Sequence, residues 1–162
     1  NLCFTSDRFV HTELGYNYRM TNVQAAIGVA QLEQIDFIEK KKRWIGHKYN
    51  HFLENLKNIN LPLVKTNYCE NIYWVYAITL KDNYFKTAKQ VMSELKDKNI
   101  GTRPFFYPMH KQPIFNKMGL FLDDKLPTSE KLYQQGLYIP SGLALTEIQI
   151  KEVSLALHKI VN

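Results

Sequence analysis

The chain has 162 residues, of which 45% are hydrophobic and 13% aromatic. A chain of this length and composition can bury a core of its own, which excludes a disordered protein and favours one folded unit. Its net charge is +6, from 21 lysines and arginines against 15 aspartates and glutamates. Such an excess could attract a nucleic acid, an acidic membrane or a phosphorylated small molecule, and the sign alone does not choose among them.

Two features bear on the compartment. The sequence has no run of about 18 apolar residues, and its first eight residues, NLCFTSDR, have neither the basic nor the long apolar region of a signal peptide. Cys3 and Cys69 form no CxxC pair, so neither a disulfide framework nor a structural zinc site is expected. We therefore expect a soluble, cytoplasmic protein with free thiols and no membrane partner.

A long helix is predicted from Thr21 onward. Thr21 and Gln24 have the spacing of a capping box, in which two side chains satisfy otherwise unpaired backbone donors. Apolar residues then recur at helical spacing, and no proline interrupts them before Pro62. A helix of roughly 35 residues would span about 50 Å, more than a domain of this size requires, so we expect it to bridge to something else. A kink or break at Gly46 is the alternative.

The rest of the chain predicts strands alternating with helices. The expected elements are an aromatic strand covered on both faces over 71–80, a helix over 87–98, a strand from about Ile100, a proline-stiffened loop over 102–115, and helices over 129–135 and 146–160. This order predicts an α+β fold, with helices on a small, mainly antiparallel sheet and a long N-terminal bridging helix. Residues 1–21 form a loop segment, and residues 22–162 form the α+β domain.

The segment ELGYNYRMTNVQAA, residues 13–26, carries the first candidate site. Asn17 offers amide donors, Tyr18 a hydroxyl and Arg19 a planar fork suited to phosphate or carboxylate. All three come just before a predicted helix N-terminus, whose free N–H groups favour anions. The segment therefore predicts an anion-binding loop. In the alternative, the tyrosines pack on the core and Arg19 forms a surface salt bridge.

The segment GTRPFFYPMHKQP, residues 101–113, carries the second. Its three prolines hold polar groups at fixed geometry with little entropy to lose on binding. Arg103 could bind a phosphate, and His110 could bind a sugar hydroxyl or act as an acid or base. For His110, a structural hydrogen bond is the alternative.

Two further patterns favour simpler interpretations. The basic run Lys40–Arg43 would suit a nucleic acid, but it lies mid-helix between Glu39 and Trp44, as a solvated helix face would. His47 and His51 could share a metal ion at helical spacing, but no carboxylate stands at ligand spacing beside them. We expect no nucleic acid partner and no metal site.

The two loops together resemble the DegT/DnrJ/EryC1/StrS sugar aminotransferases, fold-type I enzymes that use pyridoxal phosphate (PLP) to place an amine on a nucleotide-linked keto sugar. The motif GYNYRMTNVQAAIGVAQLEQID is followed in order by YWVYAITL, IGTRPFFYPMHKQP, LYIPSGLAL and a terminal helix. The resemblance covers nearly the whole chain and implies the small C-terminal domain of such an enzyme. The strand and the second loop look most like those of GDP-perosamine synthases, which use a GDP-4-keto-6-deoxy sugar with glutamate as amino donor.

The resemblance also implies residue roles in a homodimeric enzyme. Asn17 would reach the PLP phosphate of the neighbouring subunit, which makes residues 1–21 an active-site loop segment. The residues that would contact the nucleotide sugar are Tyr18, Arg19, Arg103, Tyr107 and His110.

One part of the family pattern is missing. The family's Schiff-base lysine lies upstream of the segment that corresponds to Asn1, and none of the 17 lysines here sits in a matching context. We therefore expect a C-terminal piece, without an initiator methionine, that needs an N-terminal PLP-binding partner and cannot transaminate alone. Such a piece should expose an apolar patch and self-associate. A non-catalytic nucleotide-sugar-binding or association domain and a basic nucleic-acid-binding domain are the alternatives.

Overall fold

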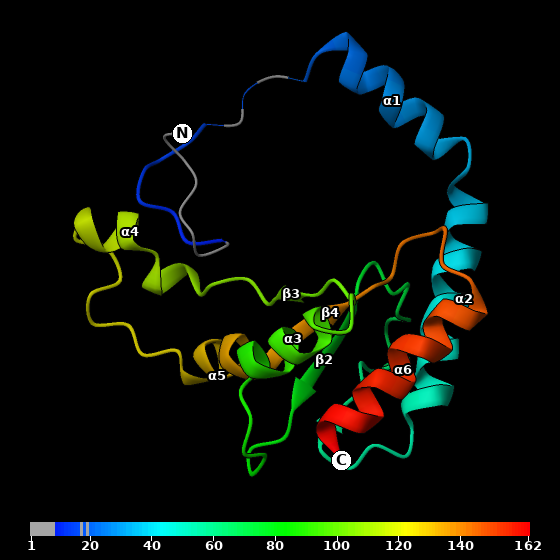
Figure 1. Cartoon of the computed structure of the whole chain (residues 1–162). Helices are drawn as coiled ribbons and strands as arrows, with labels where there is room; N and C mark the ends of the chain where they lie inside the picture. Colours follow the sequence, from blue (N-terminus) through cyan, green and yellow to red (C-terminus); the bar gives the residue numbers. More distant parts are fainter. Residues whose placement is uncertain (1–8, 17, 19) are drawn as a thin grey trace.

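The computed structural model describes residues 9–16, 18 and 20–162, and it has helices packed on one small sheet (Figure 1). The elements in chain order are α1 (Asn22–Leu32), α2 (Ile35–Leu53), β1 (Ile59–Asn60), β2 (Tyr76–Leu80), α3 (Ala88–Lys96), β3 (Arg103–Pro104), the 3₁₀ helix η1 (Met109–Lys111), α4 (Pro113–Lys117), α5 (Pro127–Gln135), β4 (Gly136–Ile139) and α6 (Glu147–Val161). The four strands have the order β1-β2-β4-β3, and every pair is antiparallel. The predicted α+β class is confirmed.

The core lies between one face of the sheet and the helices α2, α3 and α6. Tyr76, Ile78 and Leu80 alternate along β2 and are buried, whereas the residues between them are partly exposed. The aromatic strand predicted over 71–80 is therefore shorter than expected and is fully covered on one face only. Its first half is not extended, because the backbone of Tyr73 has a positive φ of 52°.

The N-terminal helical stretch is two helices rather than one. The chain leaves the helix after Leu32 and re-enters it at Ile35, whereas Gly46, the predicted break, lies inside α2 without interrupting it. Gly46 has another role: a β-carbon there would overlap the buried ring of Tyr73. The glycine allows close packing of α2 on the chain ahead of β2. The predicted capping box of Thr21 is present.

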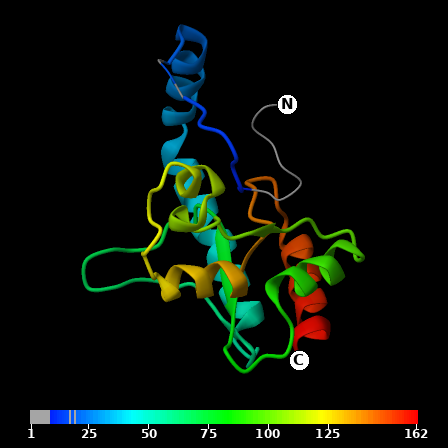
Figure 2. The same cartoon turned by 90° about the vertical axis from the view of Figure 1, so that its left-hand side faces the viewer.

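Helix α1 projects away from the rest of the protein, as Figures 1 and 2 show. None of its residues is buried, and Val23, Ile27, Val29 and Leu32 are each more than half exposed. The expected exposed apolar patch is therefore present on this helix. None of the helices in the described part of the chain combines the length and apolar character that crossing a bilayer requires.

Candidate functional site

A cavity of about 440 Å³ lies where β3 pairs with β4 and contains one of the predicted site residues. It is lined by Val75, Gly101, Thr102, Arg103, Tyr138, Ile139, Pro140 and Ser141. Arg103 lies opposite Tyr138 in the ladder and is exposed. Its guanidinium has no hydrogen-bond or ion-pair partner among the described residues, so its planar fork is available to a phosphate or carboxylate.

Lys42 of α2 holds the backbone next to this cavity in place. Its Nζ donates to the carbonyl oxygens of Trp74 at 2.8 Å and Ser141 at 2.6 Å. Burial lowers the pKa of Lys42 below its ordinary value of 10.5. Arg43 beside it donates to the carbonyl of Asn71 at 3.1 Å. The interpretation of the basic run as a solvated face is therefore wrong for its second half, because these two side chains reach backbone carbonyls that the sequence pattern does not reveal.

His110 makes a hydrogen bond of the kind that its structural alternative requires. It is buried in η1, and its Nε2 lies 3.1 Å from Oε1 of Glu130 on α5. Lys111 lies 3.5 Å from the same oxygen. Tyr107 also packs toward α5, with its ring edge-on to Tyr133 at 5.0 Å between centroids. Neither His110 nor Tyr107 lines the Arg103 cavity; both join the proline-rich loop to α5.

The Glu130 contact predicts how stability depends on pH. The hydrogen bond to His110 and the charge of Lys111 hold the pKa of Glu130 below its ordinary 4.5. A carboxylate with a lowered folded-state pKa stabilises the fold fully above about 4.5 and loses that contribution as the pH falls through the folded value. We expect Glu130→Gln to destabilise the protein at pH 7 and to have less effect at pH 3.5, measured by urea unfolding. The matched change Glu152→Gln, at an exposed site on α6, should show no such convergence.

The tyrosines of the first loop do not pack on the core. Tyr18 is 81% exposed, and its ring stacks on Tyr16 at 5.8 Å between centroids. The alternative in which both pack inward is therefore wrong. Asn17 and Arg19 lie outside the described residues.

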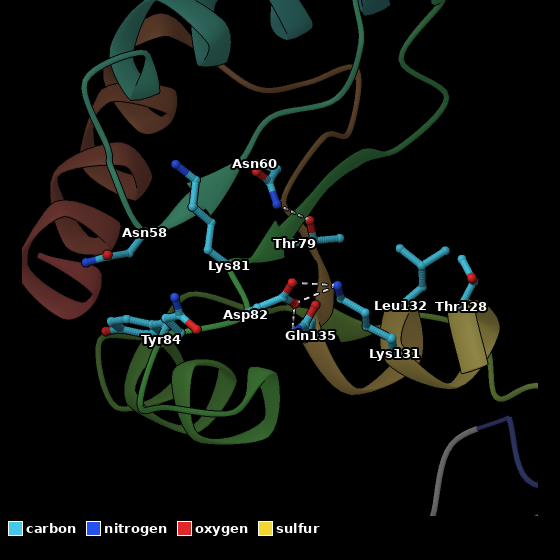
Figure 3. Close-up of a pocket in the computed structure, with 11 residues that line it drawn as sticks. Asn58, Asn60, Thr79, Lys81, Asp82, Tyr84, Thr128, Lys131, Leu132 and Gln135 are labelled. Carbon is cyan, nitrogen blue, oxygen red and sulfur yellow. Dashed lines mark hydrogen bonds and ion pairs between the residues drawn. The ribbon is translucent and has the colours of Figure 1, made fainter.

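A second cavity, of about 620 Å³, lies between α5 and the β1–β2 side of the sheet (Figure 3). Its carboxylate, Asp82, contacts Lys131 at 2.6 Å and accepts from Gln135 at 3.0 Å. These hydrogen bonds hold the pKa of Asp82 below its ordinary range. The carboxylate of Asp82 is thus already paired within the protein, and no buried side-chain N or O atom among the described residues lacks a partner.

The predicted absence of a metal site stays a prediction. His51 lies 3.9 Å from Glu54, and the ring of His47 meets Tyr73 edge-on. Within residues 9–16, 18 and 20–162, no three histidine, cysteine or acidic side chains gather as metal ligands would.

Comparison with known proteins matches residues 3–158 to the DegT/DnrJ/EryC1/StrS aminotransferase family. GDP-perosamine synthase of Vibrio cholerae is 34% identical over 156 residues, which are 96% of this chain and 41% of that protein. The GDP-perosamine synthase of Caulobacter vibrioides is 35% identical over 91% of this chain and 39% of its own length. The chain thus spans about two fifths of these relatives. Among solved structures, the Helicobacter pylori aminotransferase PseC, involved in pseudoaminic acid biosynthesis, has a TM-score of 0.73 at 20% identity, covering 99% of this chain and 43% of that one.

Proposed function

Because this chain belongs to the DegT/DnrJ/EryC1/StrS aminotransferase family, we propose that it forms part of the substrate site of a nucleotide-sugar aminotransferase similar to GDP-perosamine synthase. The observation that carries the proposal is the guanidinium of Arg103 in the cavity between β3 and β4, which has no partner among the described residues. A diphosphate bridge offers that fork two adjacent anionic groups. The substrate would be a GDP-linked 4-keto-6-deoxy sugar, and glutamate would donate the amine.

PLP would supply the electron sink for this chemistry. The residues of this chain fit only part of what PLP requires. The residues lining the cavity include hydroxyl groups and a guanidinium that suit phosphate or sugar, but no lysine that could form an imine. Lys42, close to the cavity wall, already donates to two carbonyls. We assign the catalytic lysine to an N-terminal PLP-binding portion and no cofactor step to this chain.

The other predicted residues have different roles in this proposal. Asn17 would bind the PLP phosphate across a homodimer interface, and Tyr18 with Arg19 would line the shared site. Tyr107 and His110 would hold the loop that presents Arg103, because both pack toward α5.

A chimera tests the proposal directly. In it, this chain replaces the matching 41% of the Vibrio cholerae GDP-perosamine synthase. We expect the chimera to bind PLP and transfer the amine of glutamate to a GDP-4-keto-6-deoxy sugar, and the chain alone to give no single-site lysine adduct with PLP and borohydride. A stoichiometric adduct on the chain alone, or a folded chimera that binds PLP without any turnover, would contradict the proposal.

The second candidate is a non-catalytic nucleotide-sugar-binding or association domain. The apolar helix α1, exposed along its whole length, favours it, because such a surface is typical of an interaction site. Binding of GDP sugars by the chain alone, unchanged by PLP or by the remainder of the enzyme, would support this candidate over the first.

A further inference from the structure

One side chain joins the two loops that carry the predicted site residues. Gln112 is only 4% exposed, and its carboxamide bonds in both directions with the chain about 100 residues earlier. Its Oε1 accepts from the backbone N–H of His11 at 2.9 Å, and its Nε2 donates to the carbonyl of Phe9 at 2.6 Å. A primary amide that both accepts and donates reproduces the pairing that a neighbouring strand would give to residues 9–11.

The geometry of Gln112 follows from its place in the sequence. Pro113 restricts the preceding residue to an extended backbone, and Gln112 accordingly has φ −60° and ψ 124°. Its own N–H is held by the carbonyl of Met109 at 3.1 Å, and the next N–H, of Ile114, donates to the carbonyl of His11 at 3.3 Å. The side chain therefore extends from a fixed backbone toward the N-terminal segment.

Phe9 gives an independent sign that this contact is built. Its φ is 68°, in the left-handed region, which a bulky residue occupies only where its surroundings hold it. Two contacts do so: the hydrogen bond from Gln112 to its carbonyl, and the packing of its ring on Phe106 at 4.6 Å between centroids.

We propose that Gln112 is a positioning residue that fixes residues 9–11 of the N-terminal loop segment on the loop that bears Arg103. Tyr18 follows soon after His11 in the chain, so a fixed point at residues 9–11 limits the positions that its side chain can reach. In Figure 1 the start of the described chain (blue) passes close to α4, where the N–H of Ile114 donates to the carbonyl of His11. The effect on substrate binding rests on the proposed function, whereas the structural contact does not.

Hydrogen exchange of the His11 and Ile114 amides tests the contact in the chain itself. Gln112→Met keeps the buried volume but removes the carboxamide, and Gln112→Ala removes both; Gln134→Ala, at an exposed site on α5, is the matched control. Because each lost hydrogen bond is worth about a factor of ten in such an equilibrium, we expect both Gln112 variants to speed exchange at His11 at least tenfold. Amides in α6 and the melting temperature of Gln112→Met should change little.

Three outcomes would overturn the proposal. The first is wild-type exchange at His11 as fast as in an unstructured peptide. The second is a Gln112→Met variant that protects His11 as well as the wild type does, which would mean that Gln112 only fills space. The third is faster exchange without any rise in the KM of the active chimera for the nucleotide sugar, which would remove the positioning role. An inactive chimera would instead count against the proposed function and leave the exchange result standing.

Discussion

Gly46→Ala is expected to lower the free energy of unfolding by about 3 kcal/mol, near the upper end of the cost of overpacking a core. The added methyl group would overlap the ring of Tyr73. This ring cannot easily move aside, because it is buried and its hydroxyl accepts a hydrogen bond from Asn50 at 3.0 Å. The gain in helix propensity, about 1 kcal/mol, does not offset this cost. Urea unfolding at neutral pH measures the difference.

Two controls separate the close contact from a general effect of alanine. Gly28→Ala, on α1 with no atom near the new methyl group, should leave the unfolding of the core unchanged and raise the helix content slightly. In a double-mutant cycle, Gly46→Ala should cost much less once Tyr73→Ala has removed the ring. Equal effects of the two glycine changes, or an uncoupled cycle, would show that Gly46 does not set this packing.

The sequence was most informative where local chemistry decides the structure. The capping box of Thr21 is predicted from spacing alone, and it forms, because it depends only on residues three apart. The helix over 87–98 and the final helix were likewise predicted within a few residues of α3 and α6. The order of the predicted elements indicates the α+β class, and the structure confirms it, because helices cover a small antiparallel sheet.

Prediction failed where distant residues decide. Gly136–Ile139 was not predicted as a strand, because β4 is defined by its pairing with β2 and β3 rather than by a long alternating pattern. The roles of Lys42 and Gln112 depend on partners about 100 residues away, which no local spacing indicates. Of these two residues, only Gln112 has a feature in the sequence that bears on its role, because its position before Pro113 restricts its backbone conformation.

Arg103→Gln is expected to raise the KM of the chimera for its GDP-linked sugar at least tenfold while leaving the KM for glutamate within about twofold. The reason is that a hydrogen-bonded charge pair between guanidinium and phosphate is worth about 1.5–3 kcal/mol, and 1.4 kcal/mol corresponds to a factor of ten. Glutamine keeps some hydrogen-bonding capacity but loses the charge and the fork. Stability should change little, because the Arg103 side chain is exposed and has no partner among the described residues. Steady-state kinetics with each substrate varied in turn measures the two constants.

Two control variants distinguish whether the nucleotide sugar is bound by the planar geometry of the Arg103 guanidinium or only by its positive charge. Arg103→Lys keeps the charge but not the planar geometry, and it should recover only part of the affinity. Arg43→Gln removes a charge of the same kind that is already held by Glu39 and Glu70 at 2.8 and 2.9 Å, so it should leave the KM for the sugar unchanged. If Arg43→Gln and Arg103→Gln raised that KM equally, the effect would come from net charge. If neither did, the nucleotide sugar would bind away from the cavity between β3 and β4, and the observation on which the proposed function depends would be lost.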